Sequence, residues 1–198
     1  MAPFPFLTLL LIGYLIGAIP FGLLLTRAAG TGDIRRSGSG NIGATNVYRT
    51  AGRKLGVLTL VLDMLKGALP LYLAWRHFPL NEAQAGLLAL ALFLGHCYPV
   101  YLRFKGGKGV ATALGIFLVL SPLAVLEVLL LFVFIVWKSR YVSMGSISAA
   151  CVMPLLIFMH LKSLPLFFAA LLIGLIVIYR HRENIERIAR GTETKLKL

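Results

Sequence analysis

The sequence predicts an all-α integral membrane protein with seven transmembrane helices, an outside N-terminus and a cytoplasmic C-terminus. The first observation is composition: apolar residues make up 59% of the 198 residues and charged residues 14%, against about 45–50% and about 25% in ordinary globular chains. The second is that long apolar runs recur along the chain, with basic residues gathered between them. A soluble chain of this length cannot hide so much apolar surface, which excludes a cytosolic enzyme, a secreted disulfide scaffold and a disordered chain.

The apolar runs mark the predicted helices in chain order. A spanning helix needs roughly 20 mostly apolar residues, about 17 at the short end. The first run has no basic residue before Arg27, unlike a cleavable signal, so we expect a retained helix. The fourth run holds Ser121-Pro122 near its middle, so it is one kinked helix or two short helices joined by a tight turn. The runs are 4–26, 57–75, 86–101, 110–137, 142–160 and 164–179.

The basic residues decide how often the run 110–137 crosses. Lys and Arg number 20 against 7 Asp and Glu, and cytoplasmic loops are enriched in Lys and Arg. All four basic clusters are expected inside, which requires that run to cross twice, breaking at Ser121-Pro122. Most of the cations lie in the segments 27–56, 103–108, 138–140 and 180–197.

The prediction is therefore a single seven-helix domain over residues 1–198, a multi-pass protein of the cell membrane. Its chemistry is expected in three segments that face the cytoplasm: the first loop (27–56), the second loop (96–110) and the tail (180–193). A nucleic-acid binder with the net charge of +13 would carry that charge on a soluble face, so no nucleic-acid partner is expected. Charge clustered beside membrane helices indicates membrane lipid and small anionic ligands.

The first loop has the composition of a phosphate-binding loop. Its Gly38-x-Gly40-x-x-Gly43 spacing is formally the dinucleotide fingerprint, but it follows a membrane helix and not a β-strand, which excludes that reading. Glycines still let the backbone approach an anion, and successive N–H groups form a concave nest. Arg49 adds a bidentate phosphate donor. The alternative is a flexible linker. Further hydrogen-bonding groups come from Ser39, Asn41, Thr45 and Asn46.

The second loop offers another phosphate site, at Gly106-Gly107-Lys108-Gly109 before a predicted helix. It is not a Walker A motif, because Gly109 stands where that motif has the magnesium-binding Ser or Thr. The helix N-terminus supplies N–H groups and a positive dipole end, and Lys108, with Lys105 nearby, supplies full charge. The alternative is a positive-inside anchor. His96 before this loop is a structural hydrogen-bonding group, or a base or donor in the site.

The tail predicts a short interfacial helix, because Ile185, Ile188 and Ala189 share one helical face among charges. Its alternative reading is a basic anchor for anionic lipid. His181 and Asn184 lie three residues apart, so they point the same way and can reach a ligand held between the two loops.

Charges within the predicted membrane helices are costly and are usually paired or functional. Asp63 and Lys66 are three residues apart, so we expect an ion pair that supports the first loop. Glu127 has no partner close to it in sequence, and the pattern assigns it no function.

Three strings carry a family resemblance: Ser37-Gly-Ser-Gly-Asn-Ile-Gly-Ala-Thr-Asn46, Gly95-His-Cys-Tyr-Pro99 with Phe104-Lys-Gly-Gly-Lys-Gly109, and Tyr179-Arg-His-Arg-Glu-Asn184. They resemble the acylphosphate-dependent glycerol-3-phosphate acyltransferases of bacteria, the PlsY family. The resemblance implies transfer of an acyl group from acyl phosphate to the 1-hydroxyl of sn-glycerol 3-phosphate, giving lysophosphatidic acid and inorganic phosphate in phospholipid synthesis. It places Ser39, Arg49, Lys108, His181 and Asn184 along the glycerol-phosphate site, with Asn41 and the motif glycines cradling phosphate.

The residues fit that chemistry without a protein nucleophile. Acyl phosphate is a mixed anhydride, so phosphate is already a good leaving group, and both substrates carry phosphate. The His-x4-Asp pair of other glycerolipid acyltransferases is absent, since Tyr101 stands five residues after His96 and no other histidine has that pattern. We therefore expect direct transfer, with a substrate phosphate or His181 accepting the hydroxyl proton. No metal and no other cofactor is predicted, because the inside loops have no carboxylate cluster.

Two other classes fit the sequence less well. A transporter or channel for phosphorylated anions would carry cations along a pathway near the midplane, whereas here they cluster toward one face. A phosphoalcohol transferase of the CDP-alcohol type needs several Asp residues for metal, and the chain has only Asp33 and Asp63.

Overall fold

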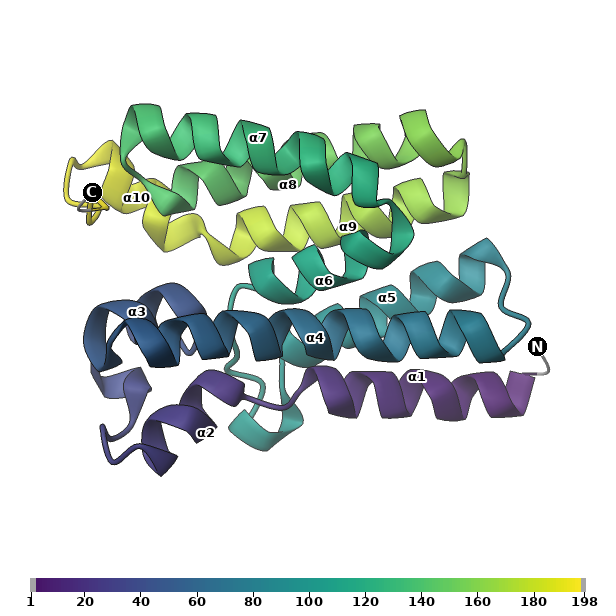
Figure 1. Cartoon of the computed structure of the whole chain (residues 1–198), viewed down its shortest axis with the longest axis horizontal. Helices are drawn as coiled ribbons and strands as arrows, with labels where there is room; N and C mark the ends of the chain where they lie inside the picture. The colour runs from purple at the N-terminus through teal and green to yellow at the C-terminus, as the bar shows by residue number, and fades with distance from the viewer. Residues whose placement is uncertain (1–2, 197–198) are drawn as a thin grey trace. The chain divides into compact units, whose positions relative to one another are not determined.

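A computed structural model describes residues 3–196, and within this range the chain consists of helices, turns and loops without a strand. It divides into two compact units, residues 1–119 and residues 120–198. The helices of Figure 1 are α1 (Pro3–Gly17), α2 (Phe21–Ala28), η1 (Ile34–Arg36), α3 (Ala44–Ala51), α4 (Arg53–His77), α5 (Glu82–Cys97), η2 (Val100–Leu102), α6 (Val110–Leu120), α7 (Pro122–Ser139), α8 (Val142–Leu161), α9 (Leu164–Arg180) and α10 (Arg182–Ala189).

The first unit is built on close contacts between helix backbones. The helices α1 and α5 pack along each other (Figure 1), and a Cβ at Gly17 would collide with the carbonyl of Leu92 in α5. The helices α4 and α6 also meet backbone to backbone. A Cβ at Gly67 would collide with the carbonyl of Thr112, and one at Gly115 with the carbonyl of Met64. Small residues let helices approach this closely in a membrane, where association depends on packing and not on the hydrophobic effect.

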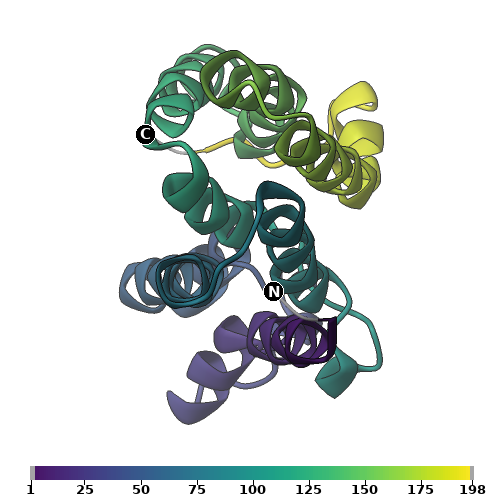
Figure 2. The same cartoon turned by 90° about the vertical axis from the view of Figure 1, so that its right-hand side faces the viewer.

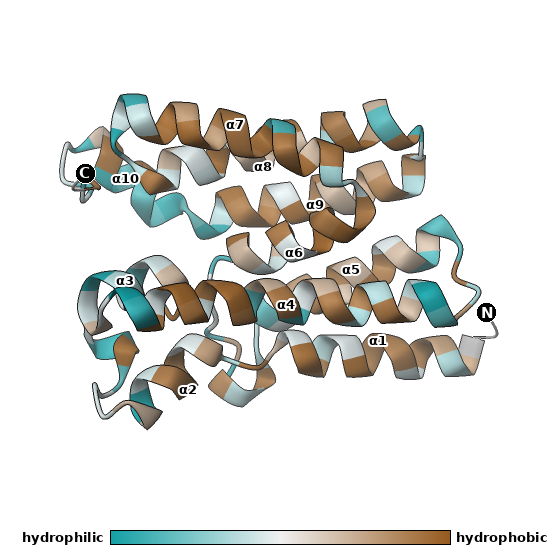
Figure 3. Ribbon diagram, in the orientation of Figure 1, coloured by the Kyte–Doolittle hydropathy of each residue, from teal (hydrophilic) through white to brown (hydrophobic). Residues whose placement is uncertain are grey.

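The second unit is a group of three long helices, because α8 packs against both α7 and α9, as Figure 2 shows from the end. Apolar residues cover most of these helices in Figure 3. Glu127 of α7, which had no partner in the local sequence, meets His160 of α8, with 3.0 Å between Oε2 and Nε2. Serine caps begin two of these helices: Ser121 accepts the N–H of Ala124, and Ser163 that of Leu166, each at 3.3 Å.

Four helices within residues 3–196 are long and apolar enough to cross a membrane: α4, α5 with η2, α7 and α8. The count rises to six if each bent pair, α1 with α2 (41°) and α9 with α10 (50°), is one span, and α6 is a shorter apolar helix. The expected break at Ser121-Pro122 is confirmed, since α6 ends at Leu120 and α7 begins at Pro122. Seven crossings and the sides of the two termini stay a prediction.

The first predicted span, 4–26, is not one straight helix but the pair α1 and α2, bent by 41°. The helix α1 ends at Gly17 and α2 begins at Phe21, after Pro20. Proline lacks an N–H and clashes with the preceding turn, which ends the first helix here. The apolar composition continues through the bend, so hydropathy alone did not reveal it.

Candidate active site

The first loop folds around the side chain of Asn46, which is 3% exposed. Its Oδ1 accepts the N–H of Ser39 at 2.9 Å, while its Nδ2 donates to the carbonyls of Asn41 at 2.8 Å and Ser37 at 3.0 Å. A Cβ at Gly38, whose φ is +59°, would collide with the same Oδ1. One amide therefore closes the loop on itself, and glycine is required where the chain passes this amide.

A small apolar cluster lies with this loop and anchors it. It consists of the buried side chains of Leu23, Ile34, Ile42 and Val47, and Leu102 of the second loop packs against it. The cluster joins α2, η1 and α3, so the first loop is a folded element with a core of its own. The alternative of a flexible linker does not fit this arrangement.

The structure separates the predicted phosphate ligands of the first loop into two kinds. Asn46 and Asn41 hold the loop together, the latter by accepting the N–H of Gly43 at 2.8 Å. The other groups are exposed: Ser39 and Gly40 before α3, and Thr45 and Arg49 on α3. Thr45 and Arg49 are four residues apart, so they lie on the same face of that helix. Phosphate binding by any of these residues stays a prediction, and the exposed residues are the better placed for it.

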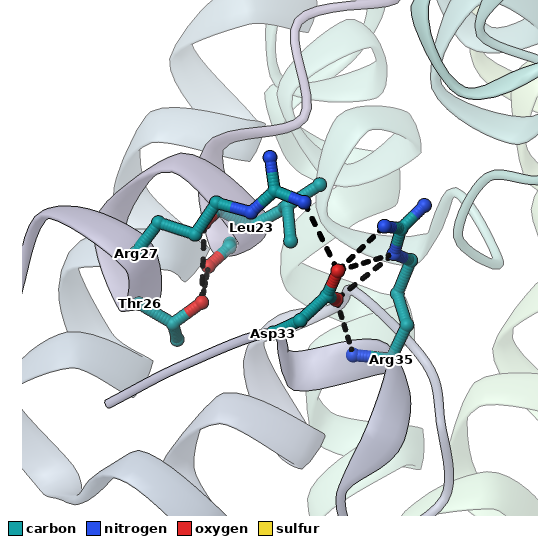
Figure 4. A network of polar contacts seen from close by, with 6 residues as sticks. Leu23, Thr26, Arg27, Asp33 and Arg35 are labelled. Carbon is teal, nitrogen blue, oxygen red and sulfur yellow. Dashed lines mark hydrogen bonds and ion pairs between the residues drawn. The ribbon is translucent and has the colours of Figure 1, made fainter. Parts of the chain in front are cut away.

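Asp33 organises the start of the first loop (Figure 4), although its only signal in the sequence was a lone acid among arginines. Its carboxylate accepts from Nη2 of Arg27 at 3.0 Å and from Nε of Arg35 at 2.9 Å, and it caps η1 by accepting the N–H of Arg35. Hydrogen bonds from Arg35, reinforced by the bond from Arg27, hold the pKa of Asp33 well below its ordinary value. Both arginines therefore pair with Asp33 at the start of the loop, and neither was predicted as a phosphate ligand.

The second loop turns back over the end of α5. The N–H of Gly106 donates to the carbonyl of Cys97 at 3.2 Å, and that of Gly107 to the carbonyl of His96 at 3.1 Å. A Cβ at Gly107 would collide with Nε2 of the His96 ring. The Gly107 backbone therefore lies against the imidazole, and the half-buried Lys108 follows it directly.

These contacts explain why glycine stands at positions 106 and 107, which the sequence alone did not reveal. Two N–H groups expected at a phosphate, those of Gly106 and Gly107, donate to protein carbonyls in this structure. Phosphate binding by the second loop stays a prediction. In this arrangement the charged side chains of Lys108 and the exposed Lys105 are the groups best suited to bind phosphate. Gly109, with φ of +81°, passes the ring of Phe93, where a Cβ would collide.

The expected ion pair within α4 is confirmed, with 2.6 Å between Nζ of Lys66 and Oδ1 of Asp63, each side chain being 2% exposed. His96 joins the pair, since its Nδ1 lies 3.7 Å from the same Asp63 oxygen. Lys66 also donates to the carbonyl of Ile19 at 2.8 Å, at the break between α1 and α2. Asp63 and Lys66 thus lie between the chain before the first loop, at Ile19, and His96, which underlies the second loop.

In the second unit, His181 lies at the bend between α9 and α10, and the short helix expected in the tail is present as α10. The ring of His181 is buried, with Nδ1 2.8 Å from the carbonyl of Val177. A carbonyl only accepts, so Nδ1 carries a hydrogen, and in the neutral form of the ring Nε2 carries the lone pair. This tautomer suits a proton acceptor.

Asn184 is held by Glu193, a residue that the sequence analysis missed. Oε1 of Glu193 accepts from Nδ2 of Asn184 at 2.6 Å and from the hydroxyl of Ser143 in α8 at 2.9 Å, while Oε2 accepts from Nε of Arg187 at 2.7 Å. Burial raises the pKa of Glu193, but these hydrogen bonds, led by that of Arg187, outweigh burial and hold it below 4.5. Its one sequence signal was an acid in a basic tail.

The predicted site residues therefore gather in two places. In the first unit, Ser39 and Asn46 share one loop, and the buried group at Asp63 underlies the loop that carries Lys108. In the second unit, His181 lies at the bend before α10 and Asn184 lies within α10, and both side chains are buried. That the two groups meet around one substrate stays a prediction.

Comparison with known proteins places the chain among enzymes of one kind. The family model described as glycerol-3-phosphate acyltransferase matches residues 7–191. A glycerol-3-phosphate acyltransferase of Syntrophotalea carbinolica is 59% identical over 97% of this chain and 98% of its own length. The enzyme of the same name from Geotalea daltonii is 54% identical over 95% and 96%.

Two crystal structures of PlsY, an integral membrane glycerol 3-phosphate acyltransferase, are also similar to the chain. The glycerol 3-phosphate form has a TM-score of 0.93 at 43% identity, covering 98% of this chain and 96% of that one. The lysophosphatidic acid form has a TM-score of 0.90 at 42% identity, with the same coverage.

Proposed function

The chain belongs to the glycerol-3-phosphate acyltransferase family, and we propose that it transfers an acyl group from acyl phosphate to the 1-hydroxyl of sn-glycerol 3-phosphate. The products are lysophosphatidic acid and inorganic phosphate. The observation that carries the proposal is the match over nearly the whole chain to enzymes of this name, one of them solved in a lysophosphatidic acid form. Acyl phosphate as donor rests on the three sequence motifs and on the two basic loops.

The reaction is a direct transfer. The 1-hydroxyl oxygen attacks the acyl carbon, the bond from that carbon to the phosphate oxygen breaks, and phosphate leaves with the electron pair. The hydroxyl proton passes to a substrate phosphate or to Nε2 of His181. Arg49 and Lys108 stabilise the phosphate charges by charge-assisted hydrogen bonds, which are roughly twice as strong as neutral ones. Ser39 and Asn184 position the glycerol phosphate.

The enzyme acts at the cell membrane with its loops toward the cytoplasm. The basic clusters support this orientation, because cytoplasmic segments are enriched in Lys and Arg. Cysteine labelling tests it: a cysteine at position 40 should react with a membrane-impermeant reagent from the cytoplasmic side, and one at position 121 from the outside. The opposite labelling at either position would contradict the topology.

The central experiment uses purified protein with palmitoyl phosphate and glycerol 3-phosphate, following both phosphate release and lysophosphatidic acid. Both products should appear in equal amounts, and excess EDTA should leave the rate unchanged. Mass spectrometry after incubation with palmitoyl phosphate alone should find no acylated residue. A stoichiometric acyl adduct on Ser39 or Cys97 would replace direct transfer by a ping-pong enzyme.

In the same experiment, variants test which charged side chains contact the substrate phosphates. Arg49→Ala and Lys108→Ala should each lose roughly 30- to 1000-fold in rate, corresponding to about 2–4 kcal/mol of transition-state stabilisation. Arg53→Ala is the matched control, since Arg53 is also an exposed arginine of the first loop and is not a predicted ligand. Equal losses in Arg49→Ala and Arg53→Ala would show a general effect of charge and not a phosphate contact.

A further inference from the structure

The second loop rests on a histidine ring. A Cβ at Gly107 would overlap Nε2 of His96, and the N–H of Gly107 donates to the His96 carbonyl at 3.1 Å. The loop backbone therefore touches both the main chain and the side chain of one residue. Because Lys108 is the next residue, a shift of this ring moves the backbone that carries the lysine.

The ring itself is buried beside an ion pair of α4. Its Nδ1 lies 3.7 Å from Oδ1 of Asp63, and the imidazole is 3% exposed. Asp63 is fixed in turn by Lys66 at 2.6 Å, and Lys66 by the carbonyl of Ile19 at 2.8 Å. The contact between His96 and Asp63 is longer than a hydrogen bond, so burial of the ring and the nearby carboxylate charge, and not a hydrogen bond between the two, keep the imidazole in place.

The far end of the loop is fixed as well, at the start of α6. A Cβ at Gly67 of α4 would collide with the carbonyl of Thr112, and one at Gly115 with the carbonyl of Met64. The loop from His96 to α6 is thus clamped at both ends against α4, the helix that carries Asp63.

Resting on the proposed function, we propose that His96, oriented by Asp63, is a positioning residue: its ring sets the place of the Gly107 backbone and so aims Lys108 at the substrate phosphate. Glycine at position 107 is then required by the imidazole. If instead the phosphate required it, a side chain at position 107 would be harmful whatever occupied position 96. The two explanations predict different behaviour when both residues are changed.

The experiment measures kcat and KM for glycerol 3-phosphate at fixed palmitoyl phosphate for His96→Ala, Gly107→Ala and the double variant. Each single change displaces Lys108, so kcat/KM should fall by about 100-fold, with KM raised. In the double variant the added methyl group has the space left by the ring, so its kcat/KM should match that of His96→Ala. Asp63→Asn should raise KM in the same direction.

His160→Ala is the matched control, because His160 also pairs with a carboxylate, Glu127, at 3.0 Å, but within α7 and α8 and outside the three predicted site segments. It should leave kcat and KM unchanged. If His96→Ala does not fold, His96→Asn replaces it, since that side chain is also smaller than the imidazole.

Two results would overturn the positioning role while the enzyme is active. One is a double variant whose loss is the product of the two single losses. The other is a lower kcat with an unchanged KM in both single variants, the pattern of a smaller folded fraction. Wild-type protein that makes no lysophosphatidic acid would overturn the proposed function itself, and this inference with it.

Discussion

The first loop and the tail are each folded around one largely buried polar side chain, a neutral amide in one and a carboxylate in the other. Asn46 donates to the backbone carbonyls of Ser37 and Asn41, with that of Ile34 at 3.4 Å, and accepts one backbone N–H, all from the loop itself. Glu193, whose side chain is 6% exposed, accepts from three side chains on α8 and α10. The amide closes a loop, whereas the carboxylate gathers separate helices.

The difference follows from the chemistry of the two groups. An amide both donates and accepts, so it can satisfy a stretch of backbone that carries both kinds of group. An ionised carboxylate only accepts, so it needs donors from elsewhere, and its bonds to charged partners are the stronger ones. The fold of the tail should therefore depend on protonation, while that of residues 37–47, which Asn46 closes, should not.

The largest effect is expected for Asn46→Asp. This change keeps the shape but replaces the donor by an oxygen facing the carbonyls of Ser37 and Asn41, each then unsatisfied at a cost of about 1–3 kcal/mol. Thermal unfolding of the purified protein should show a large fall in melting temperature, with proteolysis in the first loop. Asn41→Asp is the control: its Oδ1 accepts the N–H of Gly43, a bond that aspartate keeps. Similar losses in both would show that charge alone is responsible.

Glu193→Gln should have the next largest effect. The amide brings a donor toward Asn184 and Arg187, and losing a hydrogen bond to a charged group costs about 1.5–3 kcal/mol. The melting temperature should fall, and KM for glycerol 3-phosphate should rise because Asn184 loses its anchor. Glu186→Gln, at an exposed position of α10, should change neither. An unaltered melting temperature in Glu193→Gln would show that the carboxylate does not stabilise the fold of the tail.

Acid should loosen the tail and spare residues 37–47 of the first loop. The folded pKa of Glu193 lies below its ordinary value of 4.5, so its stabilisation is complete above 4.5 and is lost as pH falls through the folded pKa. Amide hydrogen exchange, corrected for intrinsic rates, should rise in residues 181–196 as the pH is lowered below 4.5. Residues 37–47, folded around an amide that does not titrate, should change little. Equal responses in the two regions, or an undiminished response in Glu193→Gln, would contradict the comparison.

Asp33→Asn should have the smallest effect of the set. The bonds of Asp33 to Arg27 and Arg35 lie at the exposed surface, where solvent and salt screen ion pairs. Asparagine also remains a good cap for η1. Neither the melting temperature nor the rate should change measurably. A loss as large as that of Glu193→Gln would mean that surface pairing contributes as much as the buried network.

Local signals in the sequence were enough for several of these features. Serine followed by proline at 121–122 predicted a helix start, because each suits the first turn. The spacing of Asp63 and Lys66 predicted their pairing, since residues three apart share a helix face. The apolar face at Ile185 predicted the short helix α10. Each signal lies within a few residues of the feature that it predicts.

Contacts between distant segments left no such signal. Glu193 meets Ser143 across fifty positions of sequence, and neither residue has a neighbour that indicates the other. The imidazole of His96 explains Gly107 only once the loop has turned back on α5. The sequence therefore identified glycines and cations that belong to loops, but not which of them hold the loop and which face outward.

The length of α6 has a consequence for the lipid around the protein. With 11 residues, α6 rises about 16 Å, roughly half of a hydrocarbon core about 30 Å thick. In the predicted topology of seven crossings α6 is one of the spans, and Lys108 just before it and Ser121 just after it then cannot both reach the surfaces of an undistorted bilayer. Such hydrophobic mismatch is relieved by local thinning of the bilayer. Beside α6 we therefore expect an indented membrane, where a water-soluble phosphate and a lipid-soluble acyl chain meet without either leaving its own phase.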